Sequence, residues 1–446
     1  MPSESANYLG LRGCVIDTPA YGRLRSWRDG AVIISSDGKI EEVGEYQLIG
    51  RKTRSAPVRW IEPGPVAIFP GLIDVHTHVP QYAVVARGRG RLLEWLNQYI
   101  FPKERAFTGA SGKREAKSFF PQLARQGTTT AALYTTIYPD STEAAFEAAA
   151  ESGMRIIMGA MMMDSGAAQQ PRKALSISAL ETEQLIAKWH GANDGLIEYA
   201  VSPRFALSCS DQLLARAGQI AKQHNCYIQT HLAETKDECA RVKHLFPWAH
   251  DYTDVYEKHG LLGPRTILGH CIHLNEREQQ ALLATDTKIA HCPTANLFLN
   301  SGIMPLPEYQ ALGLNIGLGT DVAAGPELNL WQVMRSAIES QRARGFYEKD
   351  IPLISPAEAL YLATLGGAQV LGKGDIIGSF EQGKDADITV MSIPAILPYR
   401  GTSLHAEALS AADILALCVY RGGPHAVMET FVRGKSVYRS ADPELF

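Results

Sequence analysis

The sequence has no marked excess of charge of either sign. Its 446 residues include 43 lysines and arginines against 47 aspartates and glutamates, which gives a formal net charge of −4. Such a balance argues against a nucleic acid or an anionic membrane surface as the main partner. Long apolar runs are also missing, since none approaches the roughly 20 residues of a bilayer-spanning helix. We therefore expect no nucleic-acid partner and no membrane insertion.

Cysteine is sparse and irregularly spaced. There are seven cysteines, and no two of them form a CxxC pair. An odd number without such pairs favours reduced thiols over a disulfide framework or a thiolate zinc site. Residues 1–5 contain neither a basic nor an apolar segment, so we recognise no secretory signal there. Together these features predict a cytoplasmic protein.

The composition is that of a globular chain with a large core. Hydrophobic residues make up 46% and charged residues 20% of the sequence. From about residue 70, apolar runs alternate with helical stretches, and eight of these runs are candidate strands: 72–75, 128–136, 155–163, 197–201, 226–231, 266–270, 288–291 and 315–320. Continuous apolar strands alternating with helices indicate a parallel sheet that is buried on both faces.

Eight such units predict an α/β fold of the (β/α)8 TIM-like barrel type. The competing architecture is a doubly wound open sheet, which would need a glycine-rich phosphate turn after an early strand. The sequence contains no such turn. Within the barrel region, the connection over 81–107 is long enough to form a lid over a site.

Both ends of the chain predict β structure. Residues 9–69 carry short apolar strands and an Asp37-Gly38 hairpin signal. Ser355 predicts the start of a helix that runs to Gly366-Gly367. Further strands are expected over 387–391, 418–421, 428–432 and 435–439. We expect the two ends to form one small β-sandwich domain from 1–69 and 376–446, with the barrel over 70–375.

Two histidines close the first barrel strand. His76 and His78 follow the run 72–75, and residues two apart in a strand point to the same side. Their imidazoles can therefore converge on one metal ion. An HxH pair is a weak signal by itself, because most histidines are solvated or satisfied within the protein.

Further polar residues lie at the ends of other predicted strands. His231, His270 and Asp321 each end one, and Glu234 comes three residues after His231. In a barrel, the carboxyl ends of all strands meet on the face where active sites are built. Imidazole and carboxylate ligands suit Zn²⁺, with Fe²⁺ as a poorer alternative. Chance placement of five buried polar groups at such ends is improbable, because each costs desolvation.

The motifs around these residues resemble the amidohydrolase superfamily and, within it, the guanine deaminase family. The superfamily-wide motifs are 70–78 (PGLIDVHTH), His231, His270 and 319–321 (GTD), with 382–387 (QGKDAD) near the end. The narrower motifs are 78–82 (HVPQY), 93–96 (LEWL), 101–102 (FP), 202–210 (SPRFALSCS), 230–235 (THLAET) and 292–302 (CPTANLFLNSG).

The resemblance implies a mononuclear zinc site with His76, His78, His231 and Asp321 as its ligands. A bridging carboxylated lysine is not expected, because the fourth strand ends in Ser202-Pro203-Arg204. His270 matches the residue that holds the reacting water and contacts the substrate, and Glu234 matches the proton shuttle. Substrate contacts are implied for Gln81, Arg204, Phe205, His231 and His270, and catalytic roles for Glu234, His270 and Asp321.

The implied activity is zinc-dependent hydrolytic deamination of guanine to xanthine and ammonia, through attack of metal-activated hydroxide at C2. The alternative is an aminohydrolase of a related ring: 8-oxoguanine, a pterin, an s-triazine or an adenosine-type nucleoside. Pro326, in the loop after Asp321, departs from the expected pattern and keeps that alternative open. A non-catalytic scaffold is a third hypothesis, opposed by the filled site positions. A purine-like small molecule is the expected partner, and a homodimer the expected assembly.

Overall fold

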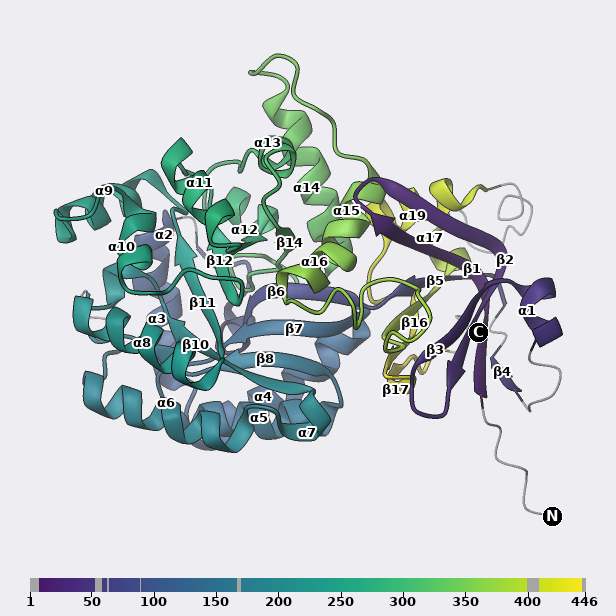
Figure 1. Ribbon diagram of the computed structural model, residues 1–446, viewed down its shortest axis with the longest axis horizontal. Coiled ribbons are helices and arrows are strands. Elements are labelled where there is room, and N and C mark those ends of the chain that lie inside the picture. The colour runs from purple at the N-terminus through teal and green to yellow at the C-terminus, as the bar shows by residue number, and fades with distance from the viewer. Residues whose placement is uncertain are drawn as a thin grey trace.

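The computed structural model describes residues 8–52, 58–61, 64–88, 90–166, 170–398 and 409–442. Residues 1–5, which carry no recognised secretory signal, lie outside these ranges. The described chain contains two sheets, one of nine strands and one of eight. In Figure 1 the purple and yellow strands from the two chain ends lie side by side at one end of the molecule, and the barrel forms the other end.

Eight parallel strands form the barrel. Their spatial order is β14-β13-β12-β11-β10-β8-β7-β6, so strands that are neighbours in the barrel also follow one another along the chain. The strands are β6 (Leu72–His78), β7 (Thr128–Tyr134), β8 (Arg155–Gly159), β10 (Ile197–Pro203), β11 (Tyr227–Leu232), β12 (Thr266–His270), β13 (Lys288–His291) and β14 (Ile316–Leu318). The predicted (β/α)8 barrel is confirmed.

Contacts between the first and the last strand close the barrel. Asp74 of β6 is buried, and it accepts hydrogen bonds from the backbone N–H of Thr320 (3.0 Å) and from its hydroxyl (2.5 Å). Gly317 of β14 packs closely on Val75, since a side-chain Cβ at Gly317 would lie 3.1 Å from the Val75 methyl carbon. The small residue therefore lets the two strands approach each other.

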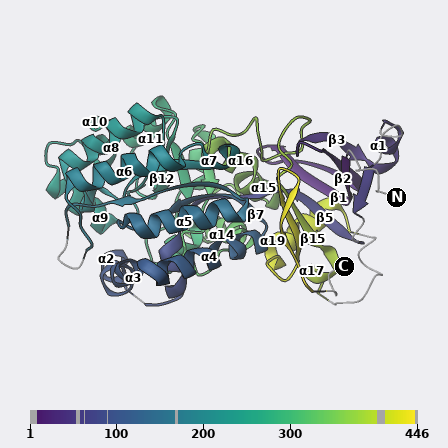
Figure 2. The same cartoon turned by 90° about the horizontal axis from the view of Figure 1, so that it is seen from below.

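Helices surround the strands, as Figure 2 shows from below. They are α4 (Gly109–Arg125), α5 (Pro139–Ser152), α6 (Leu175–Trp189), α7 (Ala192–Gly195), α8 (Asp211–His224), α9 (Lys236–Leu245), α10 (Tyr252–Lys258), α11 (Glu276–Ala284), α12 (Pro293–Phe298), α13 (Leu306–Ala311), α14 (Leu330–Arg344), α15 (Pro356–Ala363) and α16 (Leu365–Val370), with the short turn η3 (Ala206–Ser208). None of the described helices has the length and hydropathy of a membrane crossing.

The segment between β6 and β7 contains helical turns. They are η1 (Val79–Val84), α2 (Leu92–Trp95), η2 (Leu96–Ile100) and α3 (Phe101–Ala106). Trp95 and Phe101 are buried, so this segment belongs to the core. The long connection predicted over 81–107 thus packs against the barrel through buried side chains.

The chain ends form the second sheet, in the order β17-β16-β15-β5-β1-β2-β3, with β4 paired to β1. Its strands are β1 (Tyr8–Ala20), β2 (Arg23–Ser35), β3 (Ile40–Glu45), β4 (Val58–Ile61), β5 (Val66–Pro70), β15 (Ile388–Ser392), β16 (Val427–Val432) and β17 (Lys435–Arg439). Val32, Ile68 and Ile388 share one hydrophobic cluster, so both ends contribute to one core. The domain limits at residues 69 and 375 stay a proposal.

Two segments expected as β structure contain helices. Residues 418–421 end helix α19 (Ala411–Arg421), which begins with a capping box at Ser410 and Asp413. Its buried residues are Ile414, Leu415, Cys418 and Val419. That helical spacing buries one face, which the short apolar run alone could not distinguish from a strand. The N-terminal region likewise includes helix α1 (Tyr46–Lys52), and α17 (Ile393–Ile396) follows β15.

Two other elements are interrupted. The run 155–163 forms β8 and the short β9 (Met161–Met162), because the N–H of Ala160 donates to the hydroxyl of Tyr199 at 3.1 Å and leaves the ladder. The helix begins at the Ser355 capping box as predicted, but it ends at Ala363, before the predicted Gly366-Gly367. Thr364 leaves the helical conformation (φ −129°, ψ −97°), and a second helix, α16, follows it.

Candidate active site

Two histidines from the end of β6 face one carboxylate. His76 and His78 are both buried, and their Nε2 atoms lie 3.4 Å and 3.2 Å from Oδ1 of Asp321. His76 Nε2 has no hydrogen-bond partner among the described residues. A buried imidazole nitrogen without a partner is costly in free energy, unless a bound ion or ligand contacts it. Burial lowers the pKa of His78 to about 4, so this ring is neutral at pH 7.

A third histidine approaches from β11 with its ring orientation fixed. His231 Nδ1 lies 2.7 Å from the backbone oxygen of Arg204, which can only accept a hydrogen bond. Nδ1 therefore carries the proton, and the lone pair of Nε2 is available to a metal ion. Burial, followed by the neighbouring His76 and His78, holds the pKa of His231 well below its usual value. The ring is thus a neutral ligand.

His270 ends β12, and the side chain of Asn296 orients it. Its Nδ1 lies 2.8 Å from the Asn296 side-chain oxygen. Its Nε2 lies 3.5 Å from Glu234 Oε2 and 3.8 Å from Asp321 Oδ2. His270 thus lies between the two carboxylates of the site, within reach of a water or a substrate placed there.

The backbone is strained at His270, which ends β12, and at Asp321, which follows β14. His270 and Asp321 have φ angles of 70° and 46°, in the left-handed region that residues other than glycine rarely adopt. A hydrogen bond from the N–H of Cys271 to the oxygen of Leu232 (2.9 Å) supports the turn after His270. Strain of this kind costs about 1–3 kcal/mol per residue and typically persists at functional sites.

The cluster fits a divalent metal ion. The ligand atoms of His76, His231, His270 and Asp321 all lie within 4.8 Å of one another, and all four residues are buried. His78 belongs to the same group through its 3.2 Å approach to Asp321. Nitrogen and carboxylate donors in this number match the sites that hold zinc and related ions. The structure therefore brings together every metal ligand that the sequence predicted, with His270 beside them.

Glu234 has an environment that changes its acidity. It is buried, and it accepts a hydrogen bond from the hydroxyl of Ser301 at 2.9 Å. Burial, followed by the negative charge of Asp321, raises the pKa of Glu234 to about 8, while the Ser301 hydrogen bond acts in the opposite direction. The side chain of Glu238 holds the loop by accepting from the N–H of Glu234 at 2.9 Å. A carboxyl group with such a pKa can exchange a proton near neutral pH.

A narrow cavity opens beside these groups. It is lined by His78, Gln81, Leu92, Trp95, Leu96, Arg204, Phe205, His231, Glu234, His270, Leu299, Asp321 and Ala324. All five residues predicted to contact a substrate line this cavity: Gln81, Arg204, Phe205, His231 and His270. Apolar and aromatic side chains with a few polar groups are typical of a small-molecule site.

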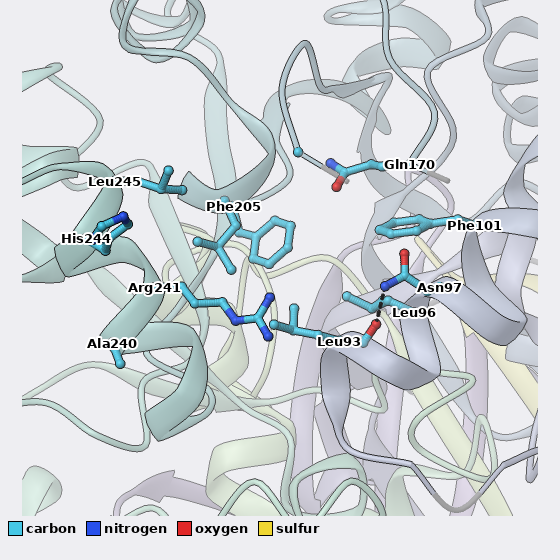
Figure 3. A pocket seen from close by; sticks show the side chains of 12 residues that line it. Leu93, Leu96, Asn97, Phe101, Gln170, Phe205, Ala240, Arg241, His244 and Leu245 are labelled. Carbon is cyan, nitrogen blue, oxygen red and sulfur yellow. Dashed lines mark hydrogen bonds between the residues drawn. The ribbon is translucent and has the colours of Figure 1, made fainter. Parts of the chain in front are cut away.

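A wider cavity of about 450 Å³ adjoins the narrow one, and Figure 3 shows its lining. Leu96 and Phe205 line both cavities. In the figure, Phe101 and Phe205 project into the wider space from opposite sides. The narrow cavity therefore has an apolar neighbour of sufficient size for a small planar molecule.

Sequence reasoning missed several residues of the site. Glu104 on α3 accepts hydrogen bonds from Gln81 and Arg204. Ser301 and Asn296 hold Glu234 and His270, although both lie in the motif 292–302 that carried the resemblance. The ring of Tyr134 stacks on His78, with 4.6 Å between centroids and 17° between planes. For Glu104 no sequence signal was available, because its contacts depend on how the excursion after β6 folds.

Comparisons with known proteins agree with this geometry. The model of the amidohydrolase family matches residues 67–437. A guanine deaminase of Escherichia coli is 37% identical over 417 residues, which cover 93% of this chain and 92% of the relative. A guanine deaminase of Homo sapiens is 33% identical over 389 residues, which cover 86% of each chain.

Among solved structures, a guanine deaminase from C. acetobutylicum with guanine bound in its active site superposes with a TM-score of 0.89. It is 30% identical, and the match covers 97% of this chain and all of that one. The resemblance to amidohydrolases, and within them to guanine deaminases, is confirmed. With a family match over most of its length and relatives this similar, the chain belongs to the amidohydrolase family.

Proposed function

We propose that this protein is a hydrolase that deaminates guanine at C2 and releases xanthine and ammonia. The observation that carries the proposal is the placement of Glu234, a buried carboxyl group 3.5 Å from His270. It lines one cavity together with Arg204 and Gln81. The relatives named as guanine deaminases match this chain along most of its length, which supports the same substrate.

The proposed cofactor is one Zn²⁺ ion for each chain, held by His76, His78, His231 and Asp321, with Fe²⁺ as the alternative. The neutral, oriented imidazole of His231 and the unpaired Nε2 of His76 support this assignment. A bound divalent ion acts as a Lewis acid and lowers the pKa of its water from 15.7 to about 7. Burial keeps competing solvent away from the ligands.

Glu234 is the proposed proton shuttle. Its carboxylate takes a proton from the attacking water and delivers it to a ring nitrogen, which makes C2 more electrophilic. The water oxygen forms a bond to C2. The proton that remains on this oxygen then passes to the amine, and the C2–N bond breaks as the C2 carbonyl of xanthine forms and ammonia leaves. His270 and Asp321 would hold the water by hydrogen bonds, because His270 Nε2 lies 3.8 Å from Asp321 Oδ2, a spacing at which one water can contact both side chains.

Recognition of the ring falls to three side chains of the cavity wall. Arg204 offers a planar donor group suited to a ring carbonyl. The amide of Gln81 can donate and accept hydrogen bonds, as the edge of a purine requires. Phe205 offers an aromatic face or edge to the base. These contacts suit an oxopurine, and the related rings remain the alternative substrates.

A metal-replete assay with guanine tests the proposal. The purified protein is loaded with Zn²⁺, its metal content is measured, and xanthine and ammonia are followed with guanine, adenine, cytosine, isoxanthopterin and ammeline. We expect one metal ion for each chain and turnover of guanine above that of every other ring. Preference for another ring would identify the protein as an aminohydrolase of that ring. A protein that takes up no metal would support the hypothesis of a non-catalytic scaffold.

We also propose a homodimer that works in the cytoplasm. Two-fold dimers are the commonest assemblies of identical chains, which supports the first part. All seven cysteines are free thiols and six of them are buried, as suits a reducing compartment. Light scattering on the purified protein tests the dimer, and a mass of about one chain would contradict it.

A further inference from the structure

One buried carboxylate links the two polar side chains of the substrate wall. Glu104 is 1% exposed and lies on α3. Its Oε1 accepts from Nε2 of Gln81 at 3.0 Å, and both of its oxygens accept from Nη1 of Arg204, at 2.8 Å and 2.7 Å. The three groups thus form a network in which Glu104 is the shared acceptor.

The surroundings of α3 hold Glu104 in this position. The guanidinium carbon of Arg204 lies 5.1 Å from the ring centroid of Phe101, which begins the same helix. The adjacent residue Lys103 forms an ion pair with Glu115 of α4 at 2.6 Å. The Arg204 guanidinium therefore packs on the helix that carries Glu104. The Lys103–Glu115 pair, whose side chains are 16% and 32% exposed, lies beside this network as a separate interaction.

This network decides which atoms remain for a substrate. The carboxylate beside Arg204 can only accept hydrogen bonds, so the amide group of Gln81 must turn its nitrogen toward Glu104. The oxygen of the Gln81 amide is then left as an acceptor. Arg204 directs Nη1 to Glu104 and keeps its other N–H groups as donors. The substrate wall thus offers a donor from Arg204 and an acceptor from Gln81.

That pairing matches one kind of purine edge and rejects its reverse. A 6-oxopurine presents a carbonyl oxygen beside an N–H, which fit a donor and an acceptor in that order. A 6-aminopurine presents an N–H beside a bare ring nitrogen. Its N–H would face the donor of Arg204, and its ring nitrogen would face the acceptor of Gln81. Sites built from fixed polar groups reject such substrates strongly, because buried partners are left unsatisfied.

We propose that Glu104 is a positioning residue which fixes the Gln81 amide and the Arg204 guanidinium, and thereby selects the 6-oxo edge of the substrate. The inference rests on the proposed function, since it concerns the ring that the same cavity receives. Glu104 acts through its two neighbours and contacts neither the reacting carbon nor the metal ligands.

The test compares Glu104→Gln with the unmodified zinc enzyme on two substrates that both carry an amine at C2: guanine and 2,6-diaminopurine. A glutamine at position 104 can donate or accept, so Gln81 becomes free to turn over. We expect kcat/KM for guanine to fall about 10- to 100-fold, mainly through KM. The preference for guanine over 2,6-diaminopurine should fall by about tenfold or more, while metal content stays unchanged.

Two further variants separate positioning from simple damage to the fold. Glu115→Gln breaks the ion pair that joins Lys103 of α3 to Glu115 of α4, and it should leave both the KM and the preference unchanged. Combining Gln81→Glu with Glu104→Gln exchanges the ends of the hydrogen bond, since the amide at 104 now donates to a carboxylate that only accepts. This double variant should regain most of the guanine preference that Glu104→Gln loses.

Clear results would overturn the inference. One is a Glu104→Gln enzyme with normal metal content whose KM and substrate preference equal those of the unmodified enzyme. Another is an equal loss of preference in Glu115→Gln. If Glu104→Gln does not fold, Glu104→Asp, which keeps the charge on a shorter stem, decides by the same two readouts. Absence of xanthine production by the unmodified zinc enzyme would instead overturn the proposed function itself.

Discussion

The backbone N–H of Asp321 donates a hydrogen bond to the carbonyl oxygen of His76 at 2.8 Å. This bond joins the end of the last barrel strand to the end of the first. The same two residues contribute ligand atoms to the candidate metal site. At Gly319 a Cβ would lie 2.7 Å from the Cβ of His76, so glycine permits the close approach. The contact that closes the barrel therefore also brings two ligand residues of the candidate metal site together.

Breaking the closure beside these ligands should destabilise the fold. Thr320→Val removes the hydroxyl that donates to the buried carboxylate of Asp74. We expect a loss of about 2 kcal/mol in the free energy of unfolding, because a charged acceptor is left short of one partner. Urea denaturation of the metal-loaded protein measures it. Thr285→Val loses hydrogen bonds to Ala281 and to the hydroxyl of Thr287 at the partly exposed end of α11. It should change stability by about 0.5 kcal/mol or less, because water can replace the lost bonds there. Equal effects of the two variants would contradict the argument.

The proton shuttle can be tested without changing the shape of the site. Glu234→Gln keeps the size of the side chain and removes its ability to carry a proton. We expect kcat to fall about 10²- to 10⁴-fold with guanine, the range typical of general acid–base catalysis. Metal content should remain that of the unmodified protein, since Glu234 is outside the proposed ligand set. Near-normal turnover by the metal-loaded variant would remove Glu234 from this role.

The pH dependence of activity should respond to Ser301. Its hydroxyl donates to Glu234 and lowers the pKa of that carboxyl, which burial raises to about 8. Ser301→Ala removes this stabilisation of the charged form, so the pKa of Glu234 should rise. Because an ionised Glu234 must accept the first proton, the acidic limb of kcat/KM should move to higher pH by roughly one unit.

Profiles of kcat/KM between pH 5.5 and 9.5 measure this shift. Ser340→Ala serves as the matched control, because Ser340 is equally buried but donates to Ala337 within its own helix. Its profile should coincide with that of the unmodified enzyme. A movement of the acidic limb to lower pH in Ser301→Ala would contradict the assigned direction.

The strand-end residues of the site were predictable because of how barrels are built. His231, His270 and Asp321 each follow an apolar run, and such runs mark buried strands whose ends converge. The position of a polar residue directly after an apolar run therefore predicted that it would lie on the same barrel face as the others. The small domain was predictable in part, since strands were expected over 428–432 and 435–439, where β16 and β17 lie.

The remaining features depend on contacts between distant parts of the chain. Glu104 contacts Arg204 across 100 residues, and Ser301 contacts Glu234 across 67. No periodicity in a local window reports such pairs. Helix α19 shows a second limit, because its apolar end residues fit either a strand or a helix until their burial is known.

The ion pair between Asp251 and Arg277 should make the free energy of unfolding depend on pH. Asp251 caps helix α10 and accepts two hydrogen bonds from Arg277, at 2.5 Å and 2.6 Å. Burial alone would raise the pKa of Asp251, but the bonds from Arg277 and the N–H of Asp254 outweigh it and hold the pKa below the usual value. The unfolded chain therefore binds a proton more readily, and the stabilisation is present above about pH 4 and disappears as the pH falls further.

Asp251→Asn isolates this charge, because asparagine keeps an oxygen that can cap the helix. Since the Arg277 side chain is 39% exposed, solvent screening limits the expected loss to about 0.5–1 kcal/mol at pH 7. Urea denaturation at pH 7 and at pH 3.5 should show the difference from the unmodified protein shrinking at the lower pH. Arg277→Gln removes the other partner and should show the same dependence. A difference that grows as the pH falls would mean that the charge of Asp251 destabilises the folded state.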